Sequence, residues 1–164
     1  MAALRVLYID DEPDIREVVE LSLGLDPSIL VRSCASGNEA LALAPDWAPD
    51  IILCDVVMPV MDGPATLARM RQCPQTANTL FVFMTSRAQA REIEHFKSLG
   101  AAGIILKPFD PMTLAEAVRS HLRQAGGLTE IRRSGSIDEL QASQRRREAA
   151  FDRINNRGFR SAVG

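Results

Sequence analysis

The chain has 164 residues, of which 46% are hydrophobic and 24% charged, and its formal net charge is −2. This length and balance are typical of one globular domain with a short appendage and a hydrophobic core of its own. No apolar run approaches the roughly 18 to 20 residues that cross a bilayer, and the segment MAALRVLYID lacks the layout of a signal peptide. We therefore expect a cytoplasmic protein that does not interact with membranes.

Five strand-like runs alternate with five helix-like runs along the first three quarters of the chain. Four of the strand-like runs are almost continuously apolar, as expected for strands that are covered on both faces. The strands are expected at residues 4–9 (LRVLYI), 29–34 (ILVRSC), 50–54 (DIILC), 79–84 (TLFVFM) and 103–106 (GIIL).

The stretches between these strands show the apolar spacing of amphipathic helices. Short connections between alternating strands and helices indicate an α/β protein whose parallel sheet carries helices on both sides. The apolar faces are Ile15, Val18, Val19 and Leu23 in one helix, Ile93 and Phe96 in another that Gly100 ends, and Leu114, Val118 and Leu122 in a third.

Polar side chains stand at the ends of the predicted strands. In a sheet of this kind, ligands bind beyond the carboxyl ends of the strands, at the point where the strand order reverses. Three carboxylates, a hydroxyl and a lysine therefore converge on one edge. The residues that follow or end the strands are, in chain order, Asp10 and Asp11, Cys34, Asp55, Thr85 and Lys107.

The three carboxylates Asp10, Asp11 and Asp55 would repel one another unless a cation lay among them. A few hard oxygen ligands that are open to water suit Mg²⁺, which keeps several waters and prefers one or two carboxylates with phosphate oxygens. We therefore expect a small magnesium site at this edge.

Lys107 and Thr85 suit a phosphoryl group in transfer. Lys107 is one of two lysines in the chain, and its ammonium could pair with Asp55 or hold a phosphoryl oxygen. Thr85 could donate a hydrogen bond to another such oxygen. Because phosphoryl transfer depends mainly on positioning and charge stabilisation, Asp55 is the candidate nucleophile that would carry the group.

Each of these residues also has an ordinary structural interpretation. Asp10 or Asp11 could cap the helix that Pro13 opens, and Asp55 could be a turn residue. Thr85 or Ser86 could be the N-cap of the next helix, and Lys107 could end a strand at the surface before Pro108. Four such residues at the ends of the right strands favour a common site.

The carboxylates, the hydroxyl and the lysine at the strand ends belong to four short motifs: YIDDEPDIRE (8–17), DVVMPVMDG (55–63), MTS (84–86) and KPF (107–109). With these motifs, the chain resembles the receiver domain of bacterial two-component response regulators, over about residues 3 to 124. The resemblance implies a flavodoxin-like fold, with a doubly wound five-stranded parallel sheet in the order 2-1-3-4-5.

The resemblance also implies a function: a phosphorylation-controlled switch that catalyses only its own phosphorylation and dephosphorylation. A histidine kinase or a histidine phosphotransfer protein would be the donor, and a downstream protein would be the target. A second copy of the chain is a further candidate partner, in a homodimer through the fourth helix, fifth strand and fifth helix or through the C-terminal extension. The implied roles are Asp55 as phospho-acceptor, Asp10, Asp11, Asp55 and the Val57 carbonyl as Mg²⁺ ligands, Thr85 as switch hydroxyl, and Lys107, before a cis Pro108, as phosphoryl contact.

The chain departs from the family pattern at Ile104. Many receivers have an aromatic residue three positions before the lysine, and it swings inward on phosphorylation. With isoleucine there, coupling to the surface would run through backbone shifts instead. Val57 and Arg87 also lack the carboxamide or carboxylate that would orient an attacking water, so we expect slow self-hydrolysis of the phosphoryl group.

Other functions fit this sequence less well. A flavin site needs a first loop rich in Gly, Ser or Thr, whereas this loop is DDEPD, which repels phosphate in the absence of a metal. A phosphatase with an aspartyl nucleophile would need a second acid at Val57. The alternatives left open are a receiver used only as an interaction module, and a fragment of a longer regulator whose output domain lies beyond Gly164.

The end of the chain differs in charge from the rest. The first 125 residues hold 11 Lys and Arg against 16 Asp and Glu, while the remainder holds 8 against 5. Its run Arg145 to Arg147 lacks a recognition motif, so nucleic-acid binding is not expected; docking on the receiver or on a second copy is the alternative to a solvated tail. We predict a receiver domain at 3–125, a linker at 126–136, and a basic, helical or partly disordered extension at 137–164.

The remaining reactive or aromatic side chains are assigned to packing. The three cysteines are odd in number and form no CxxC pair, so free thiols in a reducing compartment are expected. His95 and His121 have no neighbouring ligand set and are assigned to surface or half-buried packing in amphipathic helices. Trp47 is expected to anchor a helix end near the surface.

Overall fold

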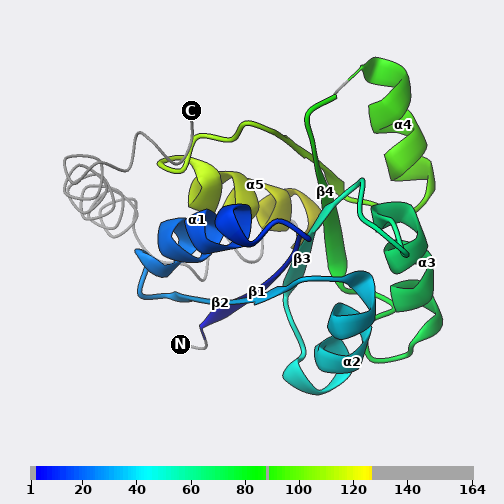
Figure 1. Cartoon of the computed structure of the whole chain (residues 1–164), viewed down its shortest axis with the longest axis horizontal. Coiled ribbons are helices and arrows are strands. Elements are labelled where there is room, and N and C mark those ends of the chain that lie inside the picture. Colours follow the sequence, from blue (N-terminus) through cyan, green and yellow to red (C-terminus); the bar gives the residue numbers. More distant parts are fainter. Residues whose placement is uncertain (1–2, 88, 127–164) are drawn as a thin grey trace.

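The computed structural model describes residues 3–87 and 89–126, and these form five strands and five helices in strict alternation (Figure 1). The predicted extension at 137–164, and all but the first residue of the predicted linker, lie outside the described residues. The elements are β1 (Leu4–Ile9), α1 (Pro13–Gly24), β2 (Ile29–Cys34), α2 (Gly37–Trp47), β3 (Ile51–Asp55), α3 (Gly63–Gln72), β4 (Leu80–Thr85), α4 (Ala90–Ser98), β5 (Gly103–Leu106) and α5 (Leu114–Gly126).

The strands form one parallel sheet in the order β2-β1-β3-β4-β5, which confirms the predicted fold class. The order reverses beside β1, so the chain first adds β2 on one side and then adds β3, β4 and β5 on the other. That reversal creates the crevice in which ligands of such sheets bind.

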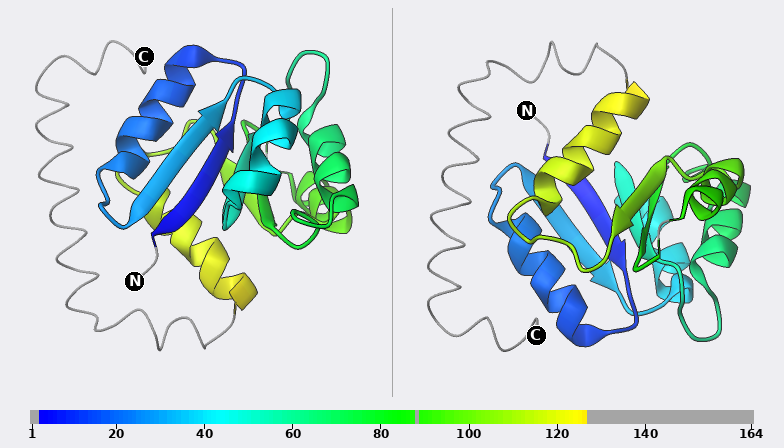
Figure 2. Two further views of the ribbon diagram at one scale, coloured as in Figure 1. Left: turned by 90° about the horizontal axis from the view of Figure 1, so that it is seen from below. Right: turned by 90° about the horizontal axis from the view of Figure 1, so that it is seen from above.

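Helices cover both faces of the sheet (Figure 2). Helices α1 and α5 pack on one face and α2, α3 and α4 on the other, which explains why the strands are apolar on both sides. On the first face the core includes Val19, Leu23 and Val118, and on the second it includes Leu67 and Phe96. None of the helices between residues 3 and 126 combines the length and apolar character that a membrane span requires.

The predicted element boundaries are close to those observed. Strands β1, β2 and β5 have the expected ends, whereas β3 and β4 begin and end one residue later than expected. The reason is backbone pairing, since Asp55 pairs with Met84 and Thr85 with Leu106. Asp55 and Thr85 are therefore the last residues of their strands, held by the ladder itself.

Helix α4 ends as its glycine predicted. Gly100 has a φ of 106°, a left-handed conformation that glycine adopts without steric cost. Its N–H donates to the Lys97 carbonyl, and the Ala101 N–H donates to the Phe96 carbonyl, which is the hydrogen-bond pair of a Schellman motif. This turn starts the short connection into β5.

Trp47 is the last residue of α2, as the sequence indicated, and two arginines hold it at the amino end of the sheet. The guanidinium groups of Arg5 and Arg32 lie 5.9 and 5.5 Å from the centre of its ring. Arg5 Nη1 also donates a 2.6 Å hydrogen bond to the Trp47 carbonyl. These contacts fix the end of α2 to β1 and β2.

Candidate functional site

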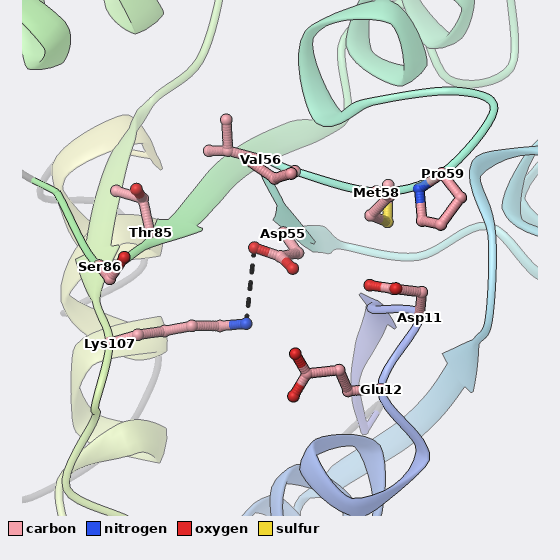
Figure 3. Close-up of a pocket in the computed structure, with 10 residues that line it drawn as sticks. Asp11, Glu12, Asp55, Val56, Met58, Pro59, Thr85, Ser86 and Lys107 are labelled. Atoms are coloured by element: carbon pink, nitrogen blue, oxygen red, sulfur yellow. Dashed lines mark ion pairs between the residues drawn. The ribbon is translucent and has the colours of Figure 1, made fainter.

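A pocket opens at the carboxyl ends of β1, β3, β4 and β5, where the parallel strands deliver their last side chains to one edge (Figure 3). Thr85 and Lys107 come from neighbouring strand ends on one side of it, and the Lys107 side chain reaches across toward Asp55. The residues lining the pocket are Asp11, Glu12, Asp55, Val56, Val57, Met58, Pro59, Thr85, Ser86 and Lys107.

Three carboxylates gather at this pocket as the sequence predicted. Oxygen atoms of Asp10, Asp11 and Asp55 all lie within 4.8 Å of one another. Asp10 is fully buried, Asp55 is half-buried and Asp11 is open to solvent. Hard, negatively charged oxygens at this spacing fit a Mg²⁺ ion that keeps part of its water shell.

Lys107 supplies the positive charge in this cluster. Its Nζ lies 2.9 Å from Asp10 Oδ2 and 3.5 Å from Asp55 Oδ1, so it bridges two of the three acids. The sequence suggested Asp55 as its partner, whereas the shorter contact is to Asp10. The peptide bond from Lys107 to Pro108 is cis, as the family resemblance implied.

The environment shifts the pKa of both partners upward. Burial raises the pKa of Asp55, and Asp10 adds to this rise while Lys107 opposes it. Burial by itself would lower the pKa of Lys107, but its contacts with Asp10 and Asp55 raise it above the ordinary value. The ammonium therefore stays charged, and Asp55 is held as an acid whose charge is poorly compensated.

The Asp10 carboxylate accepts three hydrogen bonds. Its Oδ2 accepts from the Tyr8 hydroxyl at 2.5 Å and from Lys107, and its Oδ1 accepts from the Glu12 backbone N–H at 3.0 Å. Helix α1 has Glu12 at its N-cap position, and no side chain caps that end. The helix-cap alternative for Asp10 and Asp11 is therefore wrong.

Thr85 and Ser86 lie on the opposite wall of the pocket from Asp11. The Thr85 hydroxyl accepts a 3.1 Å hydrogen bond from the Arg87 backbone N–H, which fixes the turn after β4. Neither residue caps the following helix, because Gln89 occupies the N-cap of α4. The hydroxyl is thus left beside the pocket, able to donate to a bound oxyanion.

The loop from Asp55 to α3 forms the remaining wall. Val57 is 80% exposed, and Val60 is fully exposed with a φ of 68°, a conformation that is strained for a β-branched residue. Asp62 caps α3 by accepting from the Ala65 N–H, and the Gly63 N–H donates to the Val56 carbonyl. These bonds return the loop to the strand directly after Asp55.

Gly63 allows this close return, and we predict that Gly63→Ala lowers the free energy of unfolding by about 2 kcal/mol. An added Cβ would lie 2.5 Å from the Asp55 carbonyl oxygen, 2.9 Å from Phe83 Cε1 and 3.0 Å from Val56 Cα. Two of these three atoms are backbone and cannot move aside without shifting the loop. The measurement is the urea unfolding curve of wild type and variant.

Gly24→Ala is the matched control, because nothing lies within 4 Å of a Cβ at Gly24 and the residue ends α1. It should be neutral or stabilising by up to about 1 kcal/mol, since alanine favours helix. Equal unfolding curves for the two alanine variants would show that the contact at Gly63 is not restrictive.

The pocket also includes residues to which the sequence assigned no role in the site. These are Glu12, Met58, Pro59 and Ser86, and all four lie inside the motifs that carry the family resemblance. Tyr8, which bonds Asp10, also lies in such a motif, but its position within an apolar strand indicated packing and not a polar contact.

A doubly wound sheet has an acidic pocket at its switch point, and the lysine directly after the last strand bridges two of the acids, an arrangement that indicates the class of flavodoxin-like signalling domains. The family model described as "Response regulator receiver domain" matches residues 6–119. The chain therefore belongs to the response regulator receiver domain family, whose members act as switches in two-component signalling.

Comparisons with individual proteins agree with this assignment. The chemotaxis protein CheY4 of Vibrio cholerae is 34% identical with a TM-score of 0.68, over 73% of this chain and 98% of that structure. A positive alginate biosynthesis regulatory protein of Pseudomonas aeruginosa is 36% identical, over 80% of this chain and 54% of its own length. The DNA-binding regulator RpaA of Synechocystis is 31% identical, over 81% and 55%.

The chain thus spans about half the length of these two curated relatives.

Proposed function

We propose that this protein is a phosphorylation-controlled switch that accepts a phosphoryl group on Asp55 from a histidine kinase or a histidine phosphotransfer protein. The observation that carries the proposal is the bridge of Lys107 between Asp10 and Asp55 beside a third, exposed carboxylate. Three acids with one ammonium leave negative charge that a cation would neutralise.

Asp11, Asp55 and the Val57 carbonyl, with Asp10 behind them, would hold Mg²⁺ at this pocket. When bound, Mg²⁺ supplies charge neutralisation for the phosphoryl oxygens. The Asp55 carboxylate attacks the phosphorus atom of the donor phosphohistidine, so a P–O bond forms as the P–N bond breaks and the histidine nitrogen leaves.

Lys107 and Thr85 then contact the product. The ammonium of Lys107 can pass from Asp55 to a phosphoryl oxygen, because its shorter bond to Asp10 keeps it in place. The Thr85 hydroxyl, at the end of the neighbouring strand, can donate to a second oxygen. The added charge of about −1.5 to −2 biases the nearby surface between two states that a protein partner distinguishes.

The output is proposed to pass through protein–protein contacts. The longer relatives favour a second arrangement, in which this chain is the receiver of a longer regulator and the partner surface belongs to an attached output domain. Both arrangements use the same chemistry at Asp55.

The test is intact-protein mass after incubation with acetyl phosphate, with and without Mg²⁺. We expect an adduct of about 80 Da, the mass of one added phosphoryl group in an acyl phosphate, that depends on Mg²⁺. A folded protein that forms no adduct under either condition would contradict the proposal and favour an interaction module.

A further inference from the structure

Tyr8, the single tyrosine of the chain, is fully buried in the core between the sheet and helices α1 and α5. It does not line the pocket at the strand ends. Its hydroxyl nevertheless donates a 2.5 Å hydrogen bond to Asp10 Oδ2. Tyr8 lies on β1 and Asp10 directly follows its last residue, Ile9, so the two side chains are two residues apart in extended chain and lie on the same side, and the phenol reaches the carboxylate from within the core.

The hydroxyl competes with other groups for the charge of Asp10. Oδ2 accepts from both Tyr8 and Lys107, at 2.5 and 2.9 Å, while Oδ1 accepts from the Glu12 N–H. Hydrogen bonds to an ionised carboxylate are strong, and each withdraws negative charge from the oxygen that accepts it. Asp10 is also fully buried, so water does not provide these bonds.

The phenol acts here as a hydrogen-bond donor, because Asp10 is an acceptor and the fully buried hydroxyl has its oxygen 2.5 Å from Asp10 Oδ2.

Resting on the proposed magnesium site, we propose that Tyr8 is a positioning residue that weakens divalent-cation binding by occupying Asp10 Oδ2 from the core. Lys107 and the Glu12 N–H still orient the carboxylate when the hydroxyl is removed, because each bonds a different oxygen. The main change is then more negative charge on Asp10, because one of its three side-chain hydrogen bonds is lost. A site weakened in this way exchanges its cation readily.

The experiment is an NMR titration with Mg²⁺, which follows the backbone amide shifts of the residues around Asp11 and Asp55. Tyr8→Phe keeps the ring and removes only the hydroxyl. We expect it to bind Mg²⁺ about three- to tenfold more tightly than wild type, the range expected for the loss of one ordinary hydrogen bond. Equal or weaker binding by the folded variant would overturn the role of Tyr8.

Val82→Ala is the matched control, because Val82 is fully buried in the same core cluster and contacts the cluster through apolar atoms only. It should lower stability and leave the Mg²⁺ dissociation constant unchanged. If Val82→Ala changes the Mg²⁺ dissociation constant as much as Tyr8→Phe does, the effect comes from a general loosening of the core, and the proposal is overturned. If the wild type does not bind Mg²⁺, both the proposed metal site and the role of Tyr8 are wrong. If the wild type binds Mg²⁺ and Tyr8→Phe binds it with the same affinity, only the role of Tyr8 is wrong.

Discussion

Asp55→Asn should form no phosphoryl adduct under conditions that label the wild type, because an amide oxygen lacks the charge and the nucleophilicity of a carboxylate. Asn keeps the shape of the side chain, so the end of β3 and the loop to α3 should be unchanged. The measurement is intact-protein mass with acetyl phosphate and Mg²⁺. Asp46→Asn is the matched control, because Asp46 is an exposed acid on α2, away from the pocket.

An adduct on Asp55→Asn that disappears only when another acid is replaced would assign the acceptor elsewhere. Asp11 is the alternative to examine, since it is the exposed acid of the cluster. Loss of the adduct from Asp46→Asn would instead indicate a general effect of lowered charge.

The same variant should be more stable than wild type near neutral pH. The folded protein raises the pKa of Asp55 above 3.8, mainly through burial, so the ionised form is disfavoured by folding. For a carboxyl shifted in this direction, stability is greatest below the unfolded pKa and falls as pH rises through the folded pKa. Asn carries no charge and escapes this loss. Thermal unfolding should show a higher Tm for Asp55→Asn than for wild type at neutral pH. The difference between the two Tm values should disappear as the pH falls to 3.8.

Lys107→Met should lower the free energy of unfolding by about 3 kcal/mol at neutral pH, since it removes one partner of a buried ion pair. Asp10 is fully buried and would keep only the donors Tyr8 and Glu12, while Asp55 would lose its neighbouring positive charge. Methionine fills a similar volume, so the loss is electrostatic. Urea unfolding at neutral pH measures it.

The only other lysine of the chain provides the control. Lys97 is exposed on α4, and Lys97→Met should change stability by less than about 0.5 kcal/mol. Because the folded pKa of Lys107 is raised, its contribution is complete below the ordinary value of 10.5 and is lost as pH rises through the folded value. The two variants should therefore converge only in strong alkali. Equal stability at neutral pH would mean that Asp10 does not need the ammonium.

The strand and helix pattern was predictable because both faces of the sheet are covered. Almost continuously apolar runs such as 4–9 and 103–106 are favoured where the protein covers both faces of a strand, and their bounds were predicted correctly. The ends of β3 and β4 were misplaced by one residue, because the ladder includes Asp55 and Thr85, which are polar. Hydrophobicity does not report backbone pairing.

The gathering of Asp10, Asp11 and Asp55 was also predictable, since parallel strands end at one edge. Their detailed contacts were not. That Lys107 lies closer to Asp10 than to Asp55 depends on the direction of its side chain, and the bond from Tyr8 depends on alternation along the extended chain from Tyr8 to Asp10. A tyrosine within an apolar run is expected to be core, and here it is both core and donor.

Trp47 gives the protein an intrinsic fluorophore at the end of the sheet opposite to Asp55. The chain has one tryptophan, and its ring lies against Arg5 and Arg32, near the start of β1. Asp10 follows Arg5 by five residues of extended strand, a separation of about 16 Å. The fluorescence emission of this indole should therefore change when α2 separates from the sheet during unfolding. It should not change when the charge near Asp10 and Asp55 changes.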